Sequence, residues 1–81
     1  MLHKKYISVI AINDKNGNLI PISIIWDDYR GENTYIIDKI LEVKKTSSKL
    51  GGGDIRYECI ICGKKRKLFY EKNRWFVESL V

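Results

Sequence analysis

The C-terminal third of the chain, residues 54–79, is the part that most constrains the fold. The segments DIRYECIIC, KRKLFYE and RWFVES are rich in β-branched and aromatic residues, which is typical of strands. Gly63-Lys64 and Lys72-Asn73 lie between these segments and suit two-residue turns. The pattern therefore predicts three short strands joined by two tight hairpins.

If both turns hold two residues, the pairing of the three strands follows by counting. The first hairpin should pair Tyr57 with Tyr70, Cys59 with Leu68, and Ile61 with Arg66. The second should pair Leu68 with Val77, Phe69 with Phe76, Tyr70 with Trp75, and Glu71 with Arg74. One face then carries apolar core residues, and the other carries both phenylalanines among charges. Opposite charges meet at Glu71 and Arg74, which supports this register.

The N-terminal half carries further strand signals. Residues 4–12 and 19–26 are rich in β-branched residues, and Asn16-Gly17 between them is a strong turn signal. Pro21 removes a ladder donor, so an edge or a bulge is expected there. Residues 34–43 fit either a strand or one helix face, and the β-branched pair and β-rich surroundings favour the strand.

A chain of 81 residues predicts a single domain over residues 1–81. The strands predict an all-β fold, a five- or six-stranded antiparallel meander that forms a small half-open barrel of the SH3-like or OB-like kind. The expected core residues are Ile22, Ile24, Trp26, Ile37, Leu41, Tyr57, Cys59, Leu68, Tyr70, Trp75 and Val77.

Cys59 and Cys62 have the spacing of a zinc knuckle or a redox motif. On a strand, however, residues three apart point to opposite faces, and a structural zinc ion needs four ligands. Strands also surround the pair, whereas a thioredoxin-type motif begins a helix. We therefore expect structural cysteines in a reduced, cytoplasmic protein, with no metal and no cofactor.

Catalytic groups are hard to assemble from the remaining residues. The acidic segment Asp27, Asp28 and Glu32 could supply paired carboxylates, but a solvated turn explains it better. The glycine-rich segment 46–53 lacks the P-loop ending and reads as a mobile loop. The N-terminal segment has no apolar run suited to a signal peptide or membrane helix. We therefore expect a non-enzymatic protein that does not bind membranes.

The charge of the chain is uneven. The net charge is +5, yet residues 1–43 carry five bases and six acids, whereas residues 44–81 carry ten bases and four acids. A predicted interaction surface on the basic part comprises Lys64, Lys65, Lys67, Phe69, Arg74 and Phe76. Two exposed phenylalanines in a mixed-charge face favour an interaction module for a protein partner or for a second copy of the chain. Bases beside aromatic rings equally suit single-stranded nucleic acid, which is the alternative.

Five features follow one another along the chain: Pro21 to Trp26, Tyr35 to Asp38, Gly51 to Gly53, Arg56-Tyr57 and the closing Arg74 to Glu78, which reads Arg-Trp-Phe-Val-Glu. This order of motifs resembles a family of small uncharacterised proteins, about 80 residues long, of clostridia and related Firmicutes. The resemblance covers roughly residues 16–79. It implies a compact β-rich domain and carries no functional residues over to this chain.

Overall fold

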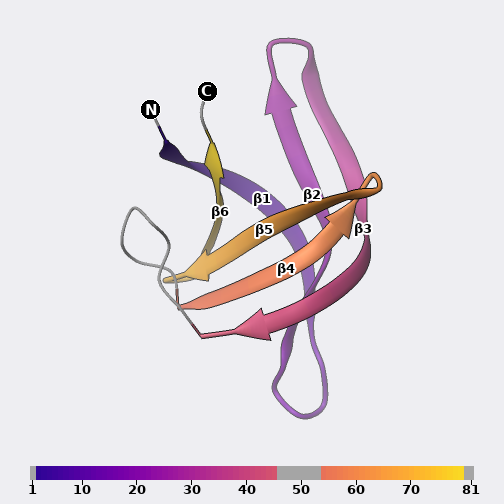
Figure 1. Cartoon of the computed structure of the whole chain (residues 1–81), viewed down its shortest axis with the longest axis vertical. Coiled ribbons are helices and arrows are strands. Elements are labelled where there is room, and N and C mark those ends of the chain that lie inside the picture. Colours follow the sequence, from indigo (N-terminus) through magenta and orange to yellow (C-terminus); the bar gives the residue numbers. More distant parts are fainter. Residues whose placement is uncertain (1, 46–53, 80–81) are drawn as a thin grey trace.

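The computed structural model of the chain describes residues 2–45 and 54–79, and all the regular elements in these ranges are β-strands (Figure 1). The predicted glycine-rich loop 46–53 lies outside the described residues. The strands are β1 (His3–Asn13), β2 (Leu19–Asp28), β3 (Gly31–Lys44), β4 (Ile55–Ile61), β5 (Lys64–Glu71) and β6 (Arg74–Ser79).

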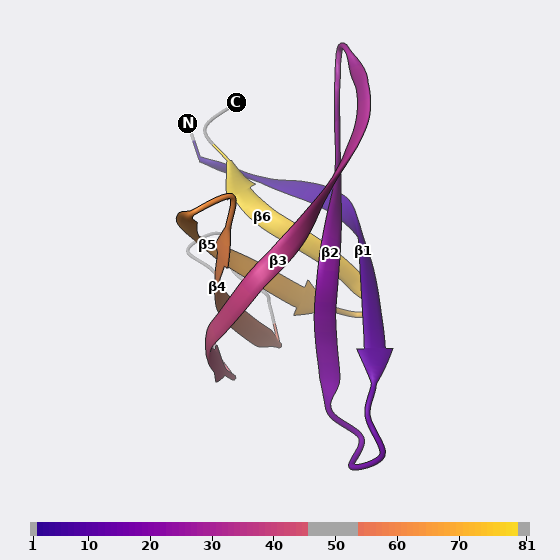
Figure 2. The same ribbon diagram turned by 90° about the vertical axis from the view of Figure 1, so that its right-hand side faces the viewer.

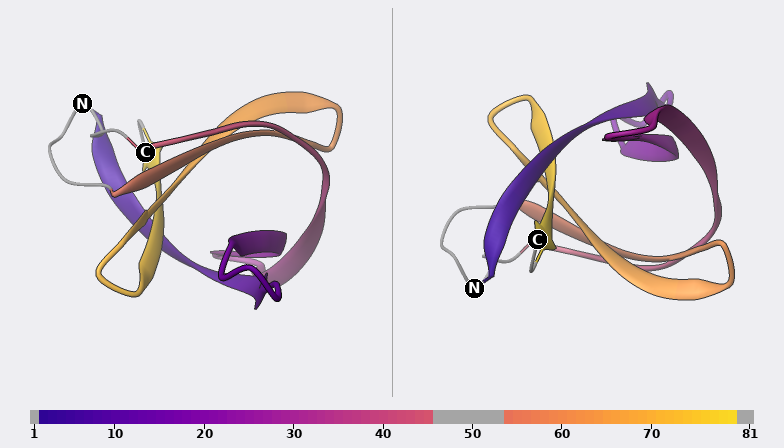
Figure 3. Two further views of the ribbon diagram at one scale, coloured as in Figure 1. Left: turned by 90° about the horizontal axis from the view of Figure 1, so that it is seen from below. Right: turned by 90° about the horizontal axis from the view of Figure 1, so that it is seen from above.

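The six strands form a closed antiparallel barrel (Figure 3). Each strand pairs with the next along the chain, and β1 pairs with β6 to close the ring. β1 has two partners, because residues 3–7 pair with β6 and residues 8–13 pair with β2. The predicted all-β antiparallel meander is confirmed, with six strands. Residues 34–43 lie within β3, so the strand interpretation of that segment is also confirmed.

The hairpin between β4 and β5 turns one residue earlier than predicted. Its central residues are Cys62 and Gly63, with φ angles of 53° and 74°. Tight hairpin turns of this kind need positive φ at both positions, and glycine meets that need at the second. The predicted pairs are wrong, and the observed pairs are Tyr57 with Leu68, Cys59 with Arg66, and Ile61 with Lys64. Because the register moves by two positions, every side chain stays on its predicted face.

The hairpin between β5 and β6 has the predicted register. Its turn residues Lys72 and Asn73 both have positive φ, at 47° and 65°. The observed pairs are Phe69 with Phe76, Tyr70 with Trp75, and Glu71 with Arg74, whereas the predicted pair of Leu68 with Val77 does not form because the strands diverge before it. The sorting of these strands into an inner and an outer face is therefore confirmed.

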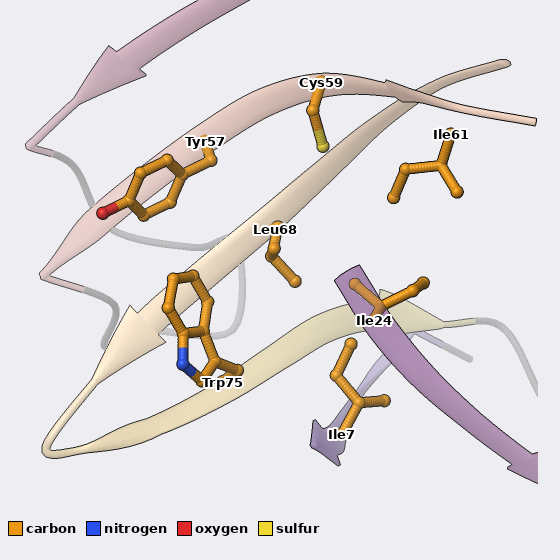
Figure 4. Packing of buried hydrophobic residues seen from close by; sticks show 7 residues of the cluster. All are labelled: Ile7, Ile24, Tyr57, Cys59, Ile61, Leu68 and Trp75. Atoms are coloured by element: carbon orange, nitrogen blue, oxygen red, sulfur yellow. The ribbon is translucent and has the colours of Figure 1, made fainter. Parts of the chain in front are cut away.

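The hydrophobic core fills the inside of the barrel. Its buried side chains are Ile7, Ile24, Tyr57, Cys59, Ile61, Leu68 and Trp75 (Figure 4). The ring centroid of Trp75 lies 5.3 Å from that of Tyr57 and 4.9 Å from that of Tyr70. The Tyr57 hydroxyl donates a hydrogen bond to the Leu19 carbonyl oxygen at 2.5 Å, which satisfies its polar end. The predicted core residues Trp26, Ile37, Tyr70 and Val77 pack against this cluster while partly exposed.

Two predicted core residues, Ile22 and Leu41, are instead exposed at 39% and 42% of their surface. Each lies where the pairing register skips one residue. Ile22 has no partner on β1, because Ile10 pairs with Ser23 and Ala11 with Pro21. A bulge of this kind adds one residue to a strand and breaks its alternation of faces. The sequence predicts an edge or a bulge at Pro21, and a bulge is found at the next residue, Ile22, but its effect on the Ile22 side chain is not predicted.

The longest dimension of the molecule, 38 Å, follows the ends of the hairpins formed by β1, β2 and β3 (Figure 2). Asp14 organises the turn between β1 and β2. Its carboxylate accepts hydrogen bonds from the backbone N–H groups of Asn18 and Asn16 at 2.8 and 2.9 Å. These bonds, led by those from Asn18, hold the pKa of Asp14 below its ordinary value.

Candidate interaction surfaces

The two phenylalanines of the predicted interaction surface lie on the outer face of the barrel, but they are covered. Phe69 and Phe76 are exposed at only 2% and 0%. Their rings stack at 5.0 Å between centroids, and the ring of Tyr6 packs edge-on against Phe76 at 5.7 Å. The ammonium of Lys4 lies 4.7 Å from the centre of the Phe76 ring. The expectation that both rings are open to a partner is therefore wrong, because Lys4 and Tyr6 of β1 pack on Phe76, and Phe76 in turn stacks on Phe69.

The buried carboxylate of Glu71 binds the two β1 side chains, Lys4 and Tyr6, that pack on Phe76. Glu71 lies on the same outer face, and 8% of its surface is exposed. Its Oε2 accepts hydrogen bonds from Lys4 Nζ at 3.0 Å and from the Tyr6 hydroxyl at 3.1 Å. Arg74 adds a further contact, with its guanidinium carbon 4.1 Å from the centre of the Tyr6 ring. We call this group, Lys4, Tyr6, Phe69, Glu71, Arg74 and Phe76, the aromatic cluster.

The bare apolar surface of the molecule lies on other strands. On the outer face of β1, β2 and β3, Ile10, Ile12 and Ile36 are exposed at 50%, 50% and 68%. Ile20 lies on the same face, because it pairs with Ile12. Ile25 lies there too, because it forms one row with Ser8 and Thr34 across the three strands. Both Ile20 and Ile25 are half-buried. We call the five side chains Ile10, Ile12, Ile20, Ile25 and Ile36 the isoleucine face.

The isoleucine face is continuous across three strands. Ile10 and Ile36 pair with the same residue of β2, Ser23, from its two sides. Ser23 is buried, with 6% exposure, although it points away from the core. The rows of this face, from Ser8 to Ile12 on β1, carry no charged side chain. The acidic pair Asp27 and Glu32 lies beyond it, at the far end of the β2–β3 hairpin.

Two apolar runs in the sequence are a signal for this face. Residues 9–12 and 22–26 are apolar apart from Ser23. A strand with only one face on the core leaves every second residue of such a run outside. These outer residues are then either covered by neighbouring side chains, as Phe76 is, or left exposed, as Ile10 and Ile36 are.

The basic residues of the predicted surface lie along β5 and are exposed. Lys64 and Arg66 pair with Ile61 and Cys59, so they share the inward-pointing face of the hairpin. Lys65 and Lys67 alternate with them and point outward, where Lys65 Nζ lies 3.6 Å from a carboxylate oxygen of Glu58. Lys65 and Lys67 share the outward face of β5 with the buried Phe69, whereas Lys64 lies on the opposite face, so the six predicted residues do not form one patch.

The two cysteines differ in position and environment. Cys59 is buried in the core, and Cys62 is exposed in the β4–β5 turn. Burial raises the pKa of the Cys59 thiol, and the nearby Glu58 carboxylate adds to the rise. Within residues 2–45 and 54–79, no group of three or more His, Cys, Asp or Glu side chains is placed to hold a metal ion.

The acidic segment at the β2–β3 connection is a turn in which its own side chains bond locally. Asp28 Oδ1 accepts a hydrogen bond from the backbone N–H of Arg30 at 2.8 Å. Gly31 follows with a φ of 114°, which favours glycine. Lys5 Nζ reaches the carbonyl oxygen of Asp27 at 3.2 Å from β1. The solvated-turn interpretation therefore describes these carboxylates.

Comparisons with protein-family models, with curated proteins and with solved structures find no match. The resemblance to the family of small clostridial proteins stays a prediction. In the described parts of the chain no helix has the length and apolar character to cross a membrane.

Proposed function

We propose that this protein is a non-catalytic interaction module that binds a second copy of itself through the isoleucine face. The observation that carries the proposal is the exposure of Ile10, Ile12 and Ile36 on one continuous surface, whose β1 and β2 positions, in the rows from Ser8 to Ile12, carry no charge. Single exposed apolar residues are ordinary on protein surfaces, but a contiguous patch marks a contact site.

The distribution of charge favours a second copy as the occupant. The isoleucine face belongs to the half of the chain that carries five bases and six acids, so two copies can approach there without strong repulsion. The basic β4–β5 hairpin opposes association of two copies through that part. A twofold contact of the isoleucine face with itself would place Ile10 and Ile36 of each copy against apolar surface.

The exposed area of the isoleucine face indicates how tightly two copies of the chain are expected to bind. Five isoleucines, of which two are already half buried, expose on the order of a few hundred Å². A stable complex buries about 800 Å² on each partner, so the contact is expected to be weak, with a Kd in the micromolar range. Association should therefore depend on concentration.

Size-exclusion chromatography with light scattering between about 5 and 500 μM tests the proposal. The wild type should shift from monomer to dimer over this range, and Ile36→Asp should stay monomeric with an unchanged circular dichroism spectrum. Val43→Asp is the matched control, because Val43 is an exposed residue of the same strand, at 57%, outside the isoleucine face. A wild type that is monomeric throughout, or equal loss of dimer in both variants, would rule the proposal out.

A further inference from the structure

The ladder between β5 and β6 is the shortest in the closed barrel. The two strands pair only at Phe69 with Phe76, Tyr70 with Trp75, and Glu71 with Arg74. Beyond these pairs β5 runs on beside β4, while β6 runs on beside β1, and the two strands diverge (Figure 1). A hollow of about 830 Å³ lies at this end of the barrel. Its volume is in the range of pockets that hold small organic ligands.

The floor of the hollow is apolar and aromatic. Trp26 of β2 and Tyr35 of β3 both line it, beside the core residue Ile24 that pairs with Tyr35. Both rings pack on the core and remain partly exposed, so each still offers surface to a ligand. From β1, Lys5 Nζ lies 4.7 Å from the centre of the Trp26 ring. Such rings can stack against a planar ligand group.

The rim of the hollow is basic. Lys64, Lys65, Arg66 and Lys67 line it from β5 and Glu78 lines it from β6, which gives four positive charges to one negative charge. Within the described part of the chain, Lys64, Arg66 and Lys67 form no ion pair, and Lys65 approaches Glu58. Four neighbouring cations on one strand repel one another unless an anion lies among them.

We propose that this hollow binds single-stranded nucleic acid, with a base against Trp26 or Tyr35 and the phosphates along Lys64 and Arg66, the two basic residues of β5 that point inward. In single-stranded nucleic acid the phosphates pair with cations and the unpaired bases stack on aromatic rings. The hollow places basic side chains and aromatic rings close enough for one strand to contact both. A double helix keeps its bases inside the stack, so it could use the rim but not the floor. This surface is separate from the isoleucine face, and the two proposals can fail independently.

Fluorescence anisotropy with labelled 12-nucleotide oligo(dT) and oligo(U) tests the proposal. Contacts to two phosphates predict that affinity falls about sevenfold between 50 and 200 mM salt. The double variant Lys64→Ser/Arg66→Ser should lose most of this salt dependence along with affinity. The matched control is Lys15→Ser/Lys72→Ser, which removes the same charge from two exposed turns away from the hollow.

A separate variant tests whether a base stacks on the aromatic floor of the hollow. Tyr35→Val removes the ring but keeps a residue of high β-strand propensity, and should weaken binding at least about fivefold at both salt concentrations, whereas Tyr35→Phe should retain binding. Circular dichroism and thermal melts establish that each variant is folded. If Tyr35→Val does not fold, the serine double variant and the salt dependence still decide the question.

Three results would overturn the proposal. The first is no binding of either oligonucleotide at 50 mM salt. The second is equal loss of affinity in the two double variants. The third is binding of a duplex or of a polyglutamate peptide as tight as that of the single strand, which would show a general attraction of anions. The monomeric Ile36→Asp variant should bind the oligonucleotide as the wild type does, which separates this outcome from that of self-association.

Discussion

The outer surface of the barrel carries two groups of apolar side chains, of which one is buried by neighbouring side chains and the other is exposed. In the aromatic cluster on β5 and β6, Phe69 and Phe76 point away from the core yet are almost fully buried. On the isoleucine face, Ile10 and Ile36 also point away from the core and stay largely exposed. The difference lies in the neighbouring side chains, because Lys4 and Tyr6 of β1 cover Phe76, which stacks on Phe69, whereas no described side chain covers the isoleucines to that extent.

This contrast separates stability from binding. Apolar area that is buried in the folded chain stabilises the fold, at roughly 25 cal/mol per Å². Apolar area left exposed stabilises little in the monomer and becomes useful only when a partner covers it. The aromatic cluster should therefore behave as a second core outside the barrel, and the isoleucine face as a contact surface.

The largest expected loss of stability comes from a substitution in the inner core, and the other losses can be compared with it. Trp75→Ala removes a ring that is 8% exposed and packed on Tyr57 and Tyr70, and should cost about 3–5 kcal/mol of unfolding free energy. Urea denaturation followed by circular dichroism measures this loss. A cost below about 1 kcal/mol would contradict the burial of this ring.

Phe76→Ala should cost nearly as much, about 3–4 kcal/mol, although Phe76 lies outside the barrel. The substitution empties the space between Phe69 and Tyr6 and removes the ring under Lys4. The same urea titration applies. If Phe76→Ala resembles a surface substitution, with a change within about 0.5 kcal/mol, the aromatic cluster is not a second core.

Glu71→Gln should cost about 1–2 kcal/mol, because the charge that accepts hydrogen bonds from Lys4 and Tyr6 is removed from a nearly buried site. Glu42→Gln is the matched control, since Glu42 forms a more exposed ion pair with Arg56 at 2.6 Å. Its expected cost is below about 0.5 kcal/mol. Equal costs in thermal or urea unfolding would show that the cover over the phenylalanines does not depend on Glu71.

The smallest expected effect is on the isoleucine face. Ile36→Thr should change the stability of the monomer by no more than about 0.5 kcal/mol, because 68% of the side chain is already exposed. Ile24→Thr, on the inner face of the neighbouring strand, should cost at least about 2 kcal/mol. These measurements are best made at low micromolar protein, where association is minor. A large loss in Ile36→Thr would place that residue in the folding core.

The pattern of alternating residues was sufficient to predict the strands and their faces. The register of the first hairpin was wrong by two positions, because Cys62-Gly63 and Gly63-Lys64 are both acceptable as two-residue turns from composition alone. An even error leaves each side chain on its face, so the core prediction survived it. The bulges at Ile22 and Leu41 could not be located, since the skip of one residue depends on how both partner strands bend.

The candidate site was harder to predict than the fold. The sequence marked Phe69 and Phe76 as outward-facing, which is correct, but burial of an outward residue depends on the distant strand that pairs beside it. Residues 3–7 and 75–79 meet only when the barrel closes, and a hairpin-by-hairpin argument does not reach that contact. The basic run on β5 was found directly, because charge can be read from composition without knowledge of the pairing.

The most direct test of this contrast is a dilution series followed by NMR of the isoleucine δ1 methyl groups. The account predicts that the methyl resonances of Ile10, Ile12 and Ile36 shift together as protein concentration rises through the micromolar range. The resonances of Ile7 and Ile61, inside the barrel, should stay fixed. Resonances of Ile10, Ile12 and Ile36 that do not change with concentration, or that move no more than those of Ile7 and Ile61, would contradict it.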